Sequence, residues 1–490
     1  MTFVSDLEPR ELWKHFDQIL TIPHGSKNEE AAAQYVIEVA TRNGLSFRRD
    51  PTGNLVVAKP SAKENGSAAT TILQSHLDMV NEKNADVEHD FTRDPISPRR
   101  EEDYLYATGT TLGSDNGIGV ASTLAVMESS SIQHGPMEFL FTVDEETGLT
   151  GAAGLQPDFL KGRRLLNLDS EEEGAVYIGC AGGAGTNLQL ALSYTKPRAK
   201  SLPLEIQLAG LRGGHSGAEI HLQRGNAIKL LGRMLSNARK RYPFQLAGFQ
   251  GGNMHNAIPR EAFAQVYIAS QKRDLLEEIL GDQLAAIQEE FRSVDPDMRL
   301  SMNDLAPSEQ VFDSERVFDR ETSTKVLHLL NALPHGVISM SYDIPDLVET
   351  SSNLATAKVE DDRLKVHLSN RSSVASALDA IQSRIAAIGE LAGAEVEELE
   401  GYPGWKPNLD SPLLKTVEEV HARIMGSKPE AKAIHAGLEC GIIGEHYAGM
   451  DMVSIGPLIE FPHSPDERVQ ISSVGSFYGL LTAILEELAE

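Results

Sequence analysis

The chain has 490 residues, too many for one compact hydrophobic core, so we expect at least two domains. Its formal net charge of -27 at pH 7 argues against nucleic acid or an anionic membrane as a partner, because both need basic patches. Its two cysteines, Cys180 and Cys440, are too few for a disulfide framework or a thiolate zinc site, so a metal would have to be held by histidines and carboxylates.

The first ten residues lack a basic head followed by an apolar run, so the sequence predicts no signal peptide. No stretch approaches the roughly 18 consecutive apolar residues of a membrane span. These features favour a cytoplasmic protein.

The first part of the chain alternates between helical and strand patterns. Leu12, Phe16 and Ile19 recur at helical spacing, and Ser26 to Glu29 has the form of a capping box that would begin a helix ending at Asn43-Gly44. A polar surface loop is predicted over 81–103, and a glycine-rich turn over 108–117 would lead into a helix at 118–127. Strands are predicted at 46–48, 55–58, 70–75, 137–141 and 165–168. This alternation predicts a doubly wound α/β sheet with helices on both faces.

From about residue 187 the pattern changes to longer alternating strands and helices, which predicts an inserted α+β lid domain over 187–398. A faint duplication is visible there: residues 256–259 precede a strand at 262–269, and residues 352–354 precede a strand at 364–368. The duplication indicates two βαβ-like repeats.

After the insert the α/β pattern returns, with helices predicted at 412–425 and 474–488 and strands at 431–434 and 452–455. The catalytic domain is therefore expected to consist of residues 1–186 and 399–490. An interrupted domain of this kind predicts a cleft, which is a preferred place for ligands.

Candidate metal ligands follow the predicted strands or the turns after them: His76, Asp115, Glu146, Asp169 and His463. Imidazole and carboxylate suit zinc or a similar first-row metal. Five ligands are more than one catalytic zinc uses, whereas two metals that share Asp115 would have three each. Asp78 lies two residues after His76 and can accept its second N–H, while Glu145 is left to take a proton from water. Each piece also has a simpler interpretation, as a solvated acidic turn, a loop histidine or a helix cap at Asp115.

Five motifs resemble those of the di-zinc aminopeptidase and carboxypeptidase superfamily, and most closely the aminoacyl-histidine dipeptidases, also called cytosol non-specific dipeptidases. They are SHLDMV at 75–80, GSDNG at 113–117, DEETG at 144–148, NLDS at 167–170 and PHSPDER at 462–468. The resemblance runs nearly from end to end and keeps the order of the motifs.

The resemblance implies that His76 and Asp169 bind one zinc and that Glu146 and His463 bind the other, with Asp115 bridging. It implies that Asp78 orients His76 and that Glu145 is the general base. Cobalt or manganese would also suit these ligands.

The resemblance also assigns substrate-binding groups. His215 in GGHSG at 213–217 matches a lid histidine that polarises the scissile carbonyl, and Asn256 and Arg371 resemble lid residues that grip the substrate carboxylate. The loop AGLECG at 436–441, which contains Gly437, would flank the pocket. Glu439 in the same loop is a candidate for binding the free α-amine of the substrate.

These features predict a di-zinc metallodipeptidase that prefers Xaa-His substrates such as carnosine. An N-acyl-amino-acid deacylase or tripeptidase could use the same metal site, and a binding protein that has lost catalysis is a further alternative, although such a protein has no use for Glu145. A homodimer through the lid is left open, since His215 could act within its own chain or across a dimer.

Overall fold

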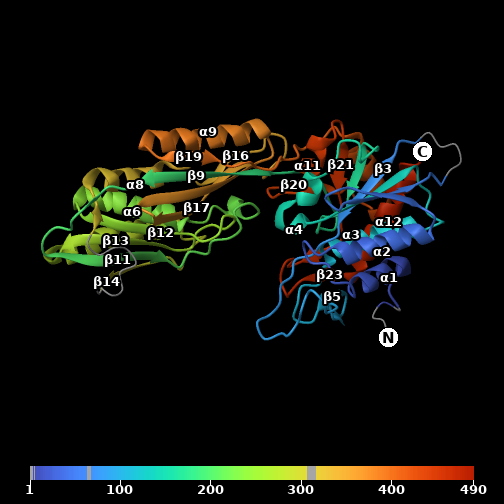
Figure 1. Cartoon of the computed structure of the whole chain (residues 1–490), viewed down its shortest axis with the longest axis horizontal. Helices are drawn as coiled ribbons and strands as arrows, with labels where there is room; N and C mark the ends of the chain where they lie inside the picture. Colours follow the sequence, from blue (N-terminus) through green and yellow to red (C-terminus); the bar gives the residue numbers. More distant parts are fainter. Residues whose placement is uncertain (1–3, 5, 63–67, 306–315) are drawn as a thin grey trace. The chain divides into compact units, whose positions relative to one another are not determined.

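The computed structural model describes residues 4, 6–62, 68–305 and 316–490, and the chain forms two compact units (Figure 1). Unit 1 consists of Met1–Cys180, Trp405–Ala433 and Leu438–Glu490, and unit 2 of Ala181–Gly404 and Ile434–Gly437. The boundaries expected from the sequence were 186/187 and 398/399. The start of the chain, where no signal peptide was predicted, lies partly outside the described residues.

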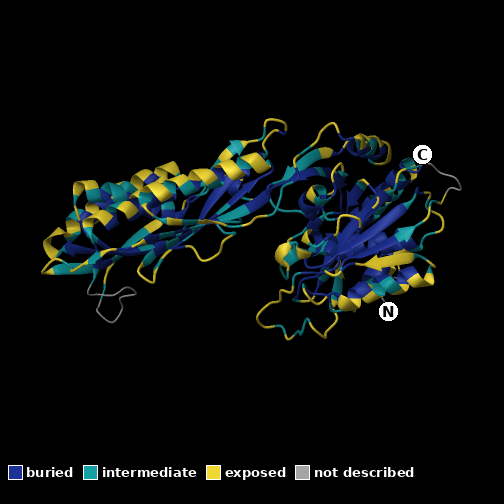
Figure 2. Ribbon diagram, turned by 45° about the horizontal axis from the view of Figure 1, so that its top comes forward, coloured by how far each residue is buried: buried dark blue, intermediate teal, exposed yellow. Residues whose placement is uncertain are grey.

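Unit 1 is built on an eight-stranded mixed sheet. Its strands, in spatial order, are β1 (Ser46–Arg49), β2 (Leu55–Lys59), β6 (Met137–Thr142), β3 (Thr71–His76), β7 (Arg164–Asn167), β21 (Asp451–Ser454), β8 (Ala175–Cys180) and β20 (Glu430–Ile434). The strands β6, β3, β7 and β21 run parallel, and β3 and β6 are buried along their whole length. Continuous apolar runs are typical of such doubly covered parallel strands. The central strands are accordingly dark blue in Figure 2.

Helices and a small second sheet complete unit 1. The helices are α1 (Arg10–Ile19), α2 (Glu30–Arg42), α3 (Ser114–Glu128), α4 (Glu145–Gly148), α5 (Thr150–Ala153), α10 (Pro412–Met425), α11 (Glu439–His446) and α12 (Ile471–Glu487). The small sheet has the order β22 (Ile459–Glu460), β23 (Arg468–Gln470), β5 (Tyr104–Ala107) and β4 (Pro98–Glu101). The helix predicted over 412–425 is confirmed, whereas the loop predicted over 81–103 was wrong at its end, because residues 98–101 pair with β5.

The capping box predicted at Ser26 to Glu29 was also wrong. The helix begins at Glu30, and its N-cap Glu29 makes no capping hydrogen bond. Both side chains bond elsewhere: the Ser26 hydroxyl donates to Asp78, 2.8 Å away, and Glu29 accepts from the N–H groups of Lys27 and Asp144. A long-range contact has replaced the local one that the pattern predicts.

Unit 2 is built on a largely antiparallel sheet. Its main strands, in spatial order, are β14 (Arg299–Asp304), β11 (Ser201–Ala209), β13 (Ala262–Ala269), β12 (Gln245–Gly251), β17 (Val348–Glu360), β18 (Arg363–Ser372), β9 (Gly182–Ala191) and β19 (Glu395–Glu398). The short strand β16 (Gly336–Met340) pairs with β17, and β10 (Tyr194–Thr195) pairs with β15 (Val317–Phe318). Its helices are η1 (Ile220–Leu222), α6 (Ala227–Arg241), η2 (Ser270–Lys272), α7 (Arg273–Glu290), α8 (Arg320–Ala332) and α9 (Ala375–Ala392).

The strand order of unit 2 reads as two four-stranded halves that meet at β12 and β17. Each half follows the same chain order: strand, helix, two strands, helix, strand. In the first half these elements are β11, α6, β12, β13, α7 and β14, and in the second they are β9, α8, β17, β18, α9 and β19. The correspondence drawn between residues 256–259 and 352–354 was wrong, because the first precede β13 while the second lie inside β17. One apolar cluster joins the sheet to α6, α7, α8 and α9.

The two units together confirm the predicted fold class, an α/β domain with a mixed sheet and a separate α+β domain. Within the described part of the chain, no helix has both the length and the apolar character needed to cross a membrane.

Candidate active site

Three parallel strands place acidic and histidine side chains at one edge of the unit 1 sheet. His76 is the last residue of β3, Glu145 and Glu146 follow β6, and Asp169 follows β7. The strands β6 and β7 are the two neighbours of β3. Because the carboxyl ends of parallel strands meet at the same edge, ligands of open α/β sheets bind there.

Two groups of potential ligands share Asp115. In one, Nε2 of His76 lies 3.2 Å from Oδ1 of Asp115 and 3.1 Å from Oδ1 of Asp169. In the other, Nε2 of His463 lies 3.2 Å from Oδ2 of Asp115 and 3.1 Å from Oε2 of Glu146. Each oxygen of the Asp115 carboxylate therefore faces a different histidine. All five predicted metal ligands come together, in two groups that could each hold a cation.

The spacing of these atoms fits metal coordination. Two ligand atoms each about 2.0–2.2 Å from a tetrahedral zinc are about 3.3 Å apart, which is close to all four distances. Oε1 of Glu146 is buried without a hydrogen-bond partner among the described residues, although buried carboxylate oxygens are normally satisfied. The donor set of imidazoles and carboxylates suits a first-row divalent metal.

The hydrogen bonds of His76 fix which ring nitrogen faces the carboxylates. Its Nδ1 lies 3.0 Å from the backbone carbonyl oxygen of Asp78 and 3.4 Å from Oδ1 of the same residue. A carbonyl oxygen can only accept, so Nδ1 carries a proton, and Nε2 is the ring nitrogen that faces Asp115 and Asp169 and could bind a metal ion. The expected role of Asp78 behind His76 thus involves its backbone as well as its side chain.

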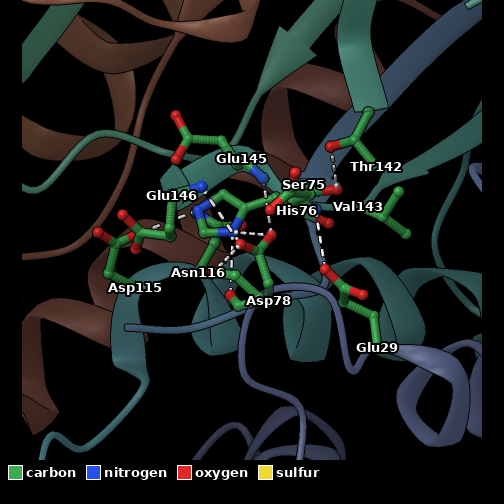
Figure 3. A network of polar contacts seen from close by, with 12 residues as sticks. Glu29, Ser75, His76, Asp78, Asp115, Asn116, Thr142, Val143, Glu145 and Glu146 are labelled. Atoms are coloured by element: carbon green, nitrogen blue, oxygen red, sulfur yellow. Dashed lines mark hydrogen bonds and ion pairs between the residues drawn. The ribbon is translucent and has the colours of Figure 1, made fainter. Parts of the chain in front are cut away.

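The Asp78 side chain also connects His76 to the segment that carries the two glutamates (Figure 3). Its carboxylate accepts from the N–H groups of Glu145, at 3.0 Å, and Glu146, at 3.2 Å, and from the hydroxyl of Ser26. A carboxylate at free N–H groups of a helix start is favourable. Burial opposes ionisation of Asp78, but the hydrogen bond and charge of His76 outweigh it and lower the pKa of Asp78 to about 2.

The site favours positive charge. Burial alone would lower the pKa values of His76 and His463, yet the surrounding carboxylates raise that of His76 well above its ordinary value and that of His463 to about 11. Burial, together with the charges of Asp169 and Glu146, raises the pKa of Glu145 well above that of an ordinary glutamic acid. A buried cluster with this surplus of carboxylates is one that a cation would stabilise.

Asn116 is a contributor that the sequence reasoning missed. Its amide donates to Oδ1 of Asp169, at 2.6 Å, and to the backbone carbonyl of Leu168, at 2.8 Å. Gly119 leaves room for this contact, because a Cβ at that position would lie 2.2 Å from Oδ1 of Asn116 and 2.7 Å from the Leu168 carbonyl oxygen. The GSDNG motif contains Asn116, but no sequence signal shows that its amide reaches the end of β7.

Glu439, predicted to bind the substrate amine, lies in unit 1 and is fully buried. Its Oε2 accepts from the amide of Gln74 and the hydroxyl of Thr142, both at 2.6 Å, while Oε1 has no partner among the described residues. Burial, only partly offset by His76 and Thr142, raises the pKa of Glu439 to about 8.

The other predicted substrate-binding residues gather within unit 2. Arg371, on β18, is buried, and its Nη1 donates to the hydroxyl of Tyr402 at 3.0 Å. No aspartate or glutamate of the described residues forms an ion pair with Arg371, and its Nε has no partner among them. A buried guanidinium without a carboxylate is unusual, because buried charges are normally paired.

The turn that carries His215 lies beside Arg371. A Cβ on Gly217 would lie 2.9 Å from Nε of Arg371 and 2.4 Å from the carbonyl oxygen of His435. Backbone hydrogen bonds from Ser216 to Asn256 and from Ile258 to Gly214 hold this turn against the loop of Asn256. Nδ1 of His215 accepts from the N–H groups of Gly217 and Ala218, so the neutral ring carries its proton on Nε2.

Gly437 packs against the aromatic ring of Tyr402. A Cβ on Gly437 would lie 2.9 Å from that ring, and one on Gly183 would lie 2.8 Å from it. Tyr402 therefore occupies a slot between two glycines with its hydroxyl at Arg371. Sequence reasoning missed Tyr402 and also His435, whose Nε2 lies 2.7 Å from the Ser351 hydroxyl, because neither belongs to a recognisable motif.

Comparisons with known proteins give a consistent result. The model of peptidase family M20/M25/M40 matches residues 72–487. The cytosol non-specific dipeptidase of Escherichia coli is 42% identical over 488 residues, which cover 100% of this chain and 99% of that protein. The crystal structure of aminoacylhistidine dipeptidase from Vibrio alginolyticus is similar with a TM-score of 0.90 and 43% identity, over 99% of this chain and 97% of that one. Human carnosine dipeptidase 1, at 13% identity and a TM-score of 0.52 over 98% of each chain, shares the fold.

The chain belongs to peptidase family M20/M25/M40. Its full-length identity to the two bacterial enzymes places it among the aminoacylhistidine and cytosol non-specific dipeptidases of that family, and it is a metallopeptidase. The predicted resemblance is confirmed.

Proposed function

We propose that the protein hydrolyses dipeptides, preferentially those that end in histidine, at a site that holds two zinc ions. The observation that carries the proposal is Asp115, whose two carboxylate oxygens face His76 and His463 separately. The names of the two bacterial relatives, a cytosol non-specific dipeptidase and an aminoacylhistidine dipeptidase, support the substrate class. We also propose that the protein acts in the cytosol.

His76, Asp115 and Asp169 would hold one ion, and Asp115, Glu146 and His463 the other. Bound there, divalent ions would supply a Lewis acid for the scissile carbonyl and lower the pKa of a water molecule. Cobalt or manganese could replace zinc at these ligands.

Glu145 would act as the general base. It makes no ion pair within the described part of the chain, unlike Glu146, which pairs with His463. Its raised pKa makes it a stronger base than an ordinary glutamate once it is ionised. Glu145 takes the proton of the attacking water and delivers it to the leaving amine, while the Nε2–H of His215 donates to the carbonyl oxygen of the substrate.

Arg371 and Asn256 would bind the terminal carboxylate of the substrate, and Gly437 would belong to the loop that flanks the pocket. A guanidinium forms two parallel hydrogen bonds with a carboxylate, and Arg371, which has no acidic partner in the described part of the chain, is available for one. Glu439 stays our candidate for the α-amine of the substrate, because Oε1 of its carboxylate is unpartnered among the described residues.

The test is to incubate the purified protein with carnosine, with and without a chelator, and with an N-acetylated amino acid and a tripeptide as competing substrates. We expect carnosine hydrolysis that the chelator abolishes and added zinc restores. Cleavage of the acylated amino acid or the tripeptide without cleavage of dipeptides would favour a deacylase or tripeptidase that uses the same site. Metal retention without any turnover would favour a binding protein.

A homodimer formed through unit 2 is a further proposal. The test is the molecular mass in solution, measured by sedimentation equilibrium, together with activity recovered on mixing a His215→Ala variant with a Glu145→Gln variant. Recovery would mean that His215 acts across subunits, and its absence that His215 acts within its own chain.

A further inference from the structure

Glu467 is a buried carboxylate that accepts five hydrogen bonds. Its side chain is 2% exposed. Oε2 accepts from the N–H groups of Leu112, at 2.7 Å, and Gly113, at 3.0 Å. Oε1 accepts from the N–H and the hydroxyl of Ser114, at 2.7 and 2.5 Å, and from the N–H of Asp115, at 3.4 Å.

These donors are the successive residues Leu112 to Asp115, which lead into the regular part of α3; Asp115 and Asn116 themselves have non-helical φ and ψ angles. Gly113 has a positive φ of 72°, a conformation that lets the N–H groups on either side point to one anion. The negative charge that fills this position comes from a segment more than 350 residues later in the chain. The pairing is favourable because hydrogen bonds from N–H groups to a carboxylate are charge-assisted.

Glu467 thereby joins the two loops that supply ligands to one candidate metal position. Asp115 is the last residue whose backbone N–H donates to Glu467. His463 lies four residues before Glu467, in the connection between β22 and β23. His463 itself is half exposed, and its Nε2 contacts the carboxylates of Asp115 and Glu146. Its place relative to Asp115 therefore depends on how its loop is held.

We propose that Glu467 is a positioning residue for the metal site, which fixes the separation of Asp115 from His463 and so sets the affinity for the cation held between them. This inference rests on the proposed metal roles of those two residues. Residues that orient metal ligands typically change metal affinity by about 10- to 100-fold when they are substituted.

The test compares Glu467→Gln with Glu138→Gln in the full-length protein. Glu138 is the matched control: it is 4% exposed in the same unit, and its carboxylate accepts from the N–H groups of Lys161 and Gly162, both at 2.9 Å, and lies 3.5 Å from Nη2 of Arg48. It stands near the beginning of β6, opposite Ile72, whereas His76 stands at the other end of the strand pair, opposite Thr142. The measurement is a calorimetric titration of the metal-free proteins with zinc, repeated with cobalt to follow its absorption spectrum.

For the wild type we expect two binding events. In Glu467→Gln one of them should weaken by about 10- to 100-fold, with an altered cobalt spectrum, and excess metal should restore carnosine turnover. In Glu138→Gln both affinities should equal those of the wild type. If Glu467→Gln does not fold, Glu467→Asp, which keeps the charge but shortens the reach, should show the same selective weakening.

Wild-type affinity at both positions in Glu467→Gln, or in Glu467→Asp where that is the variant that folds, would overturn this inference alone. An equal loss of affinity in Glu138→Gln would overturn it as well, since the effect would then come from general destabilisation. A wild type that binds fewer than two ions would overturn the proposed di-metal function, and this inference with it.

Discussion

Glu145 and Glu146 are neighbours in the chain with different surroundings. Glu146 faces His463 at 3.1 Å, whereas Glu145 has no ionic partner among the described residues. Glu145→Gln should therefore keep its metal and lose turnover by about 10²- to 10⁴-fold, the usual contribution of a general base. Elemental analysis and carnosine turnover measure the two effects. Glu173→Gln, at an exposed acid, is the control and should match the wild type.

Arg371 combines burial with the lack of an acidic partner among the described residues. Arg371→Met should raise KM for dipeptides by about 10- to 100-fold, the size expected when a charge-assisted hydrogen bond of about 1.5–3 kcal/mol is lost. The same substitution should change KM much less for the C-terminal amide of that dipeptide, which lacks the carboxylate. Equal effects on both substrates would contradict the role, and Arg384→Met, at an exposed arginine of α9, provides the control.

Glu439 gives the metal-free protein a pH-dependent stability. Burial raises its pKa to about 8 in the folded state, against about 4.3 for an exposed glutamate. Between these values the folded protein holds a proton that the unfolded chain has released, so this contribution to stability is full below the lower value and is lost as the pH rises toward 8. Glutamine resembles the protonated group and lacks this slope.

Thermal unfolding of the metal-free proteins between pH 5 and 8 checks this expectation. The midpoint of Glu439→Gln should rise relative to the wild type as the pH increases. A constant difference across this range would show that Glu439 is already ionised in the folded protein.

At the scale of elements, the short helix α4 matters more than its length suggests. Its four residues include both glutamates, whose N–H groups donate to the Asp78 carboxylate, and Ser26 in turn donates to Asp78. Asp78→Asn loses the negative charge at these N–H groups and should lower kcat by about 10- to 100-fold. Ser26→Ala removes one hydrogen bond of about 0.5–1.5 kcal/mol and should lower kcat by less than about 10-fold. Equal effects of the two substitutions on kcat, measured with carnosine, would contradict this order.

The strand pattern in the sequence predicted where the site would form, because apolar runs followed by polar turns reveal the ends of strands. It could not predict contacts made across the fold. Ser26 had the pattern of a local cap and instead donates to Asp78, 52 residues later in the turn after β3, and the amide of Asn116 reaches Asp169. The slot of Tyr402 between Gly183 and Gly437 likewise joins segments far apart in the chain. Such contacts depend on tertiary packing, which leaves no local periodicity.

At the scale of the whole molecule, the candidate metal groups found among the described residues all lie in unit 1, while unit 2 has an apolar core of its own. A ligand that binds only the folded state stabilises the unit that binds it, by about 4 kcal/mol when its concentration is 1,000 times the Kd. Removal of the metal should therefore lower the unfolding temperature of unit 1 and leave that of unit 2 unchanged.

The two tryptophans make this expectation measurable without dissecting the chain. Trp13 and Trp405 both belong to unit 1, and both are buried. Tryptophan fluorescence thus follows unit 1 alone, whereas far-UV circular dichroism follows both units. A chelator should lower the fluorescence midpoint and one dichroism transition, and leave the second dichroism transition in place. An equal shift of both transitions would mean that the units unfold as one cooperative body, so that metal bound in unit 1 stabilises the whole chain.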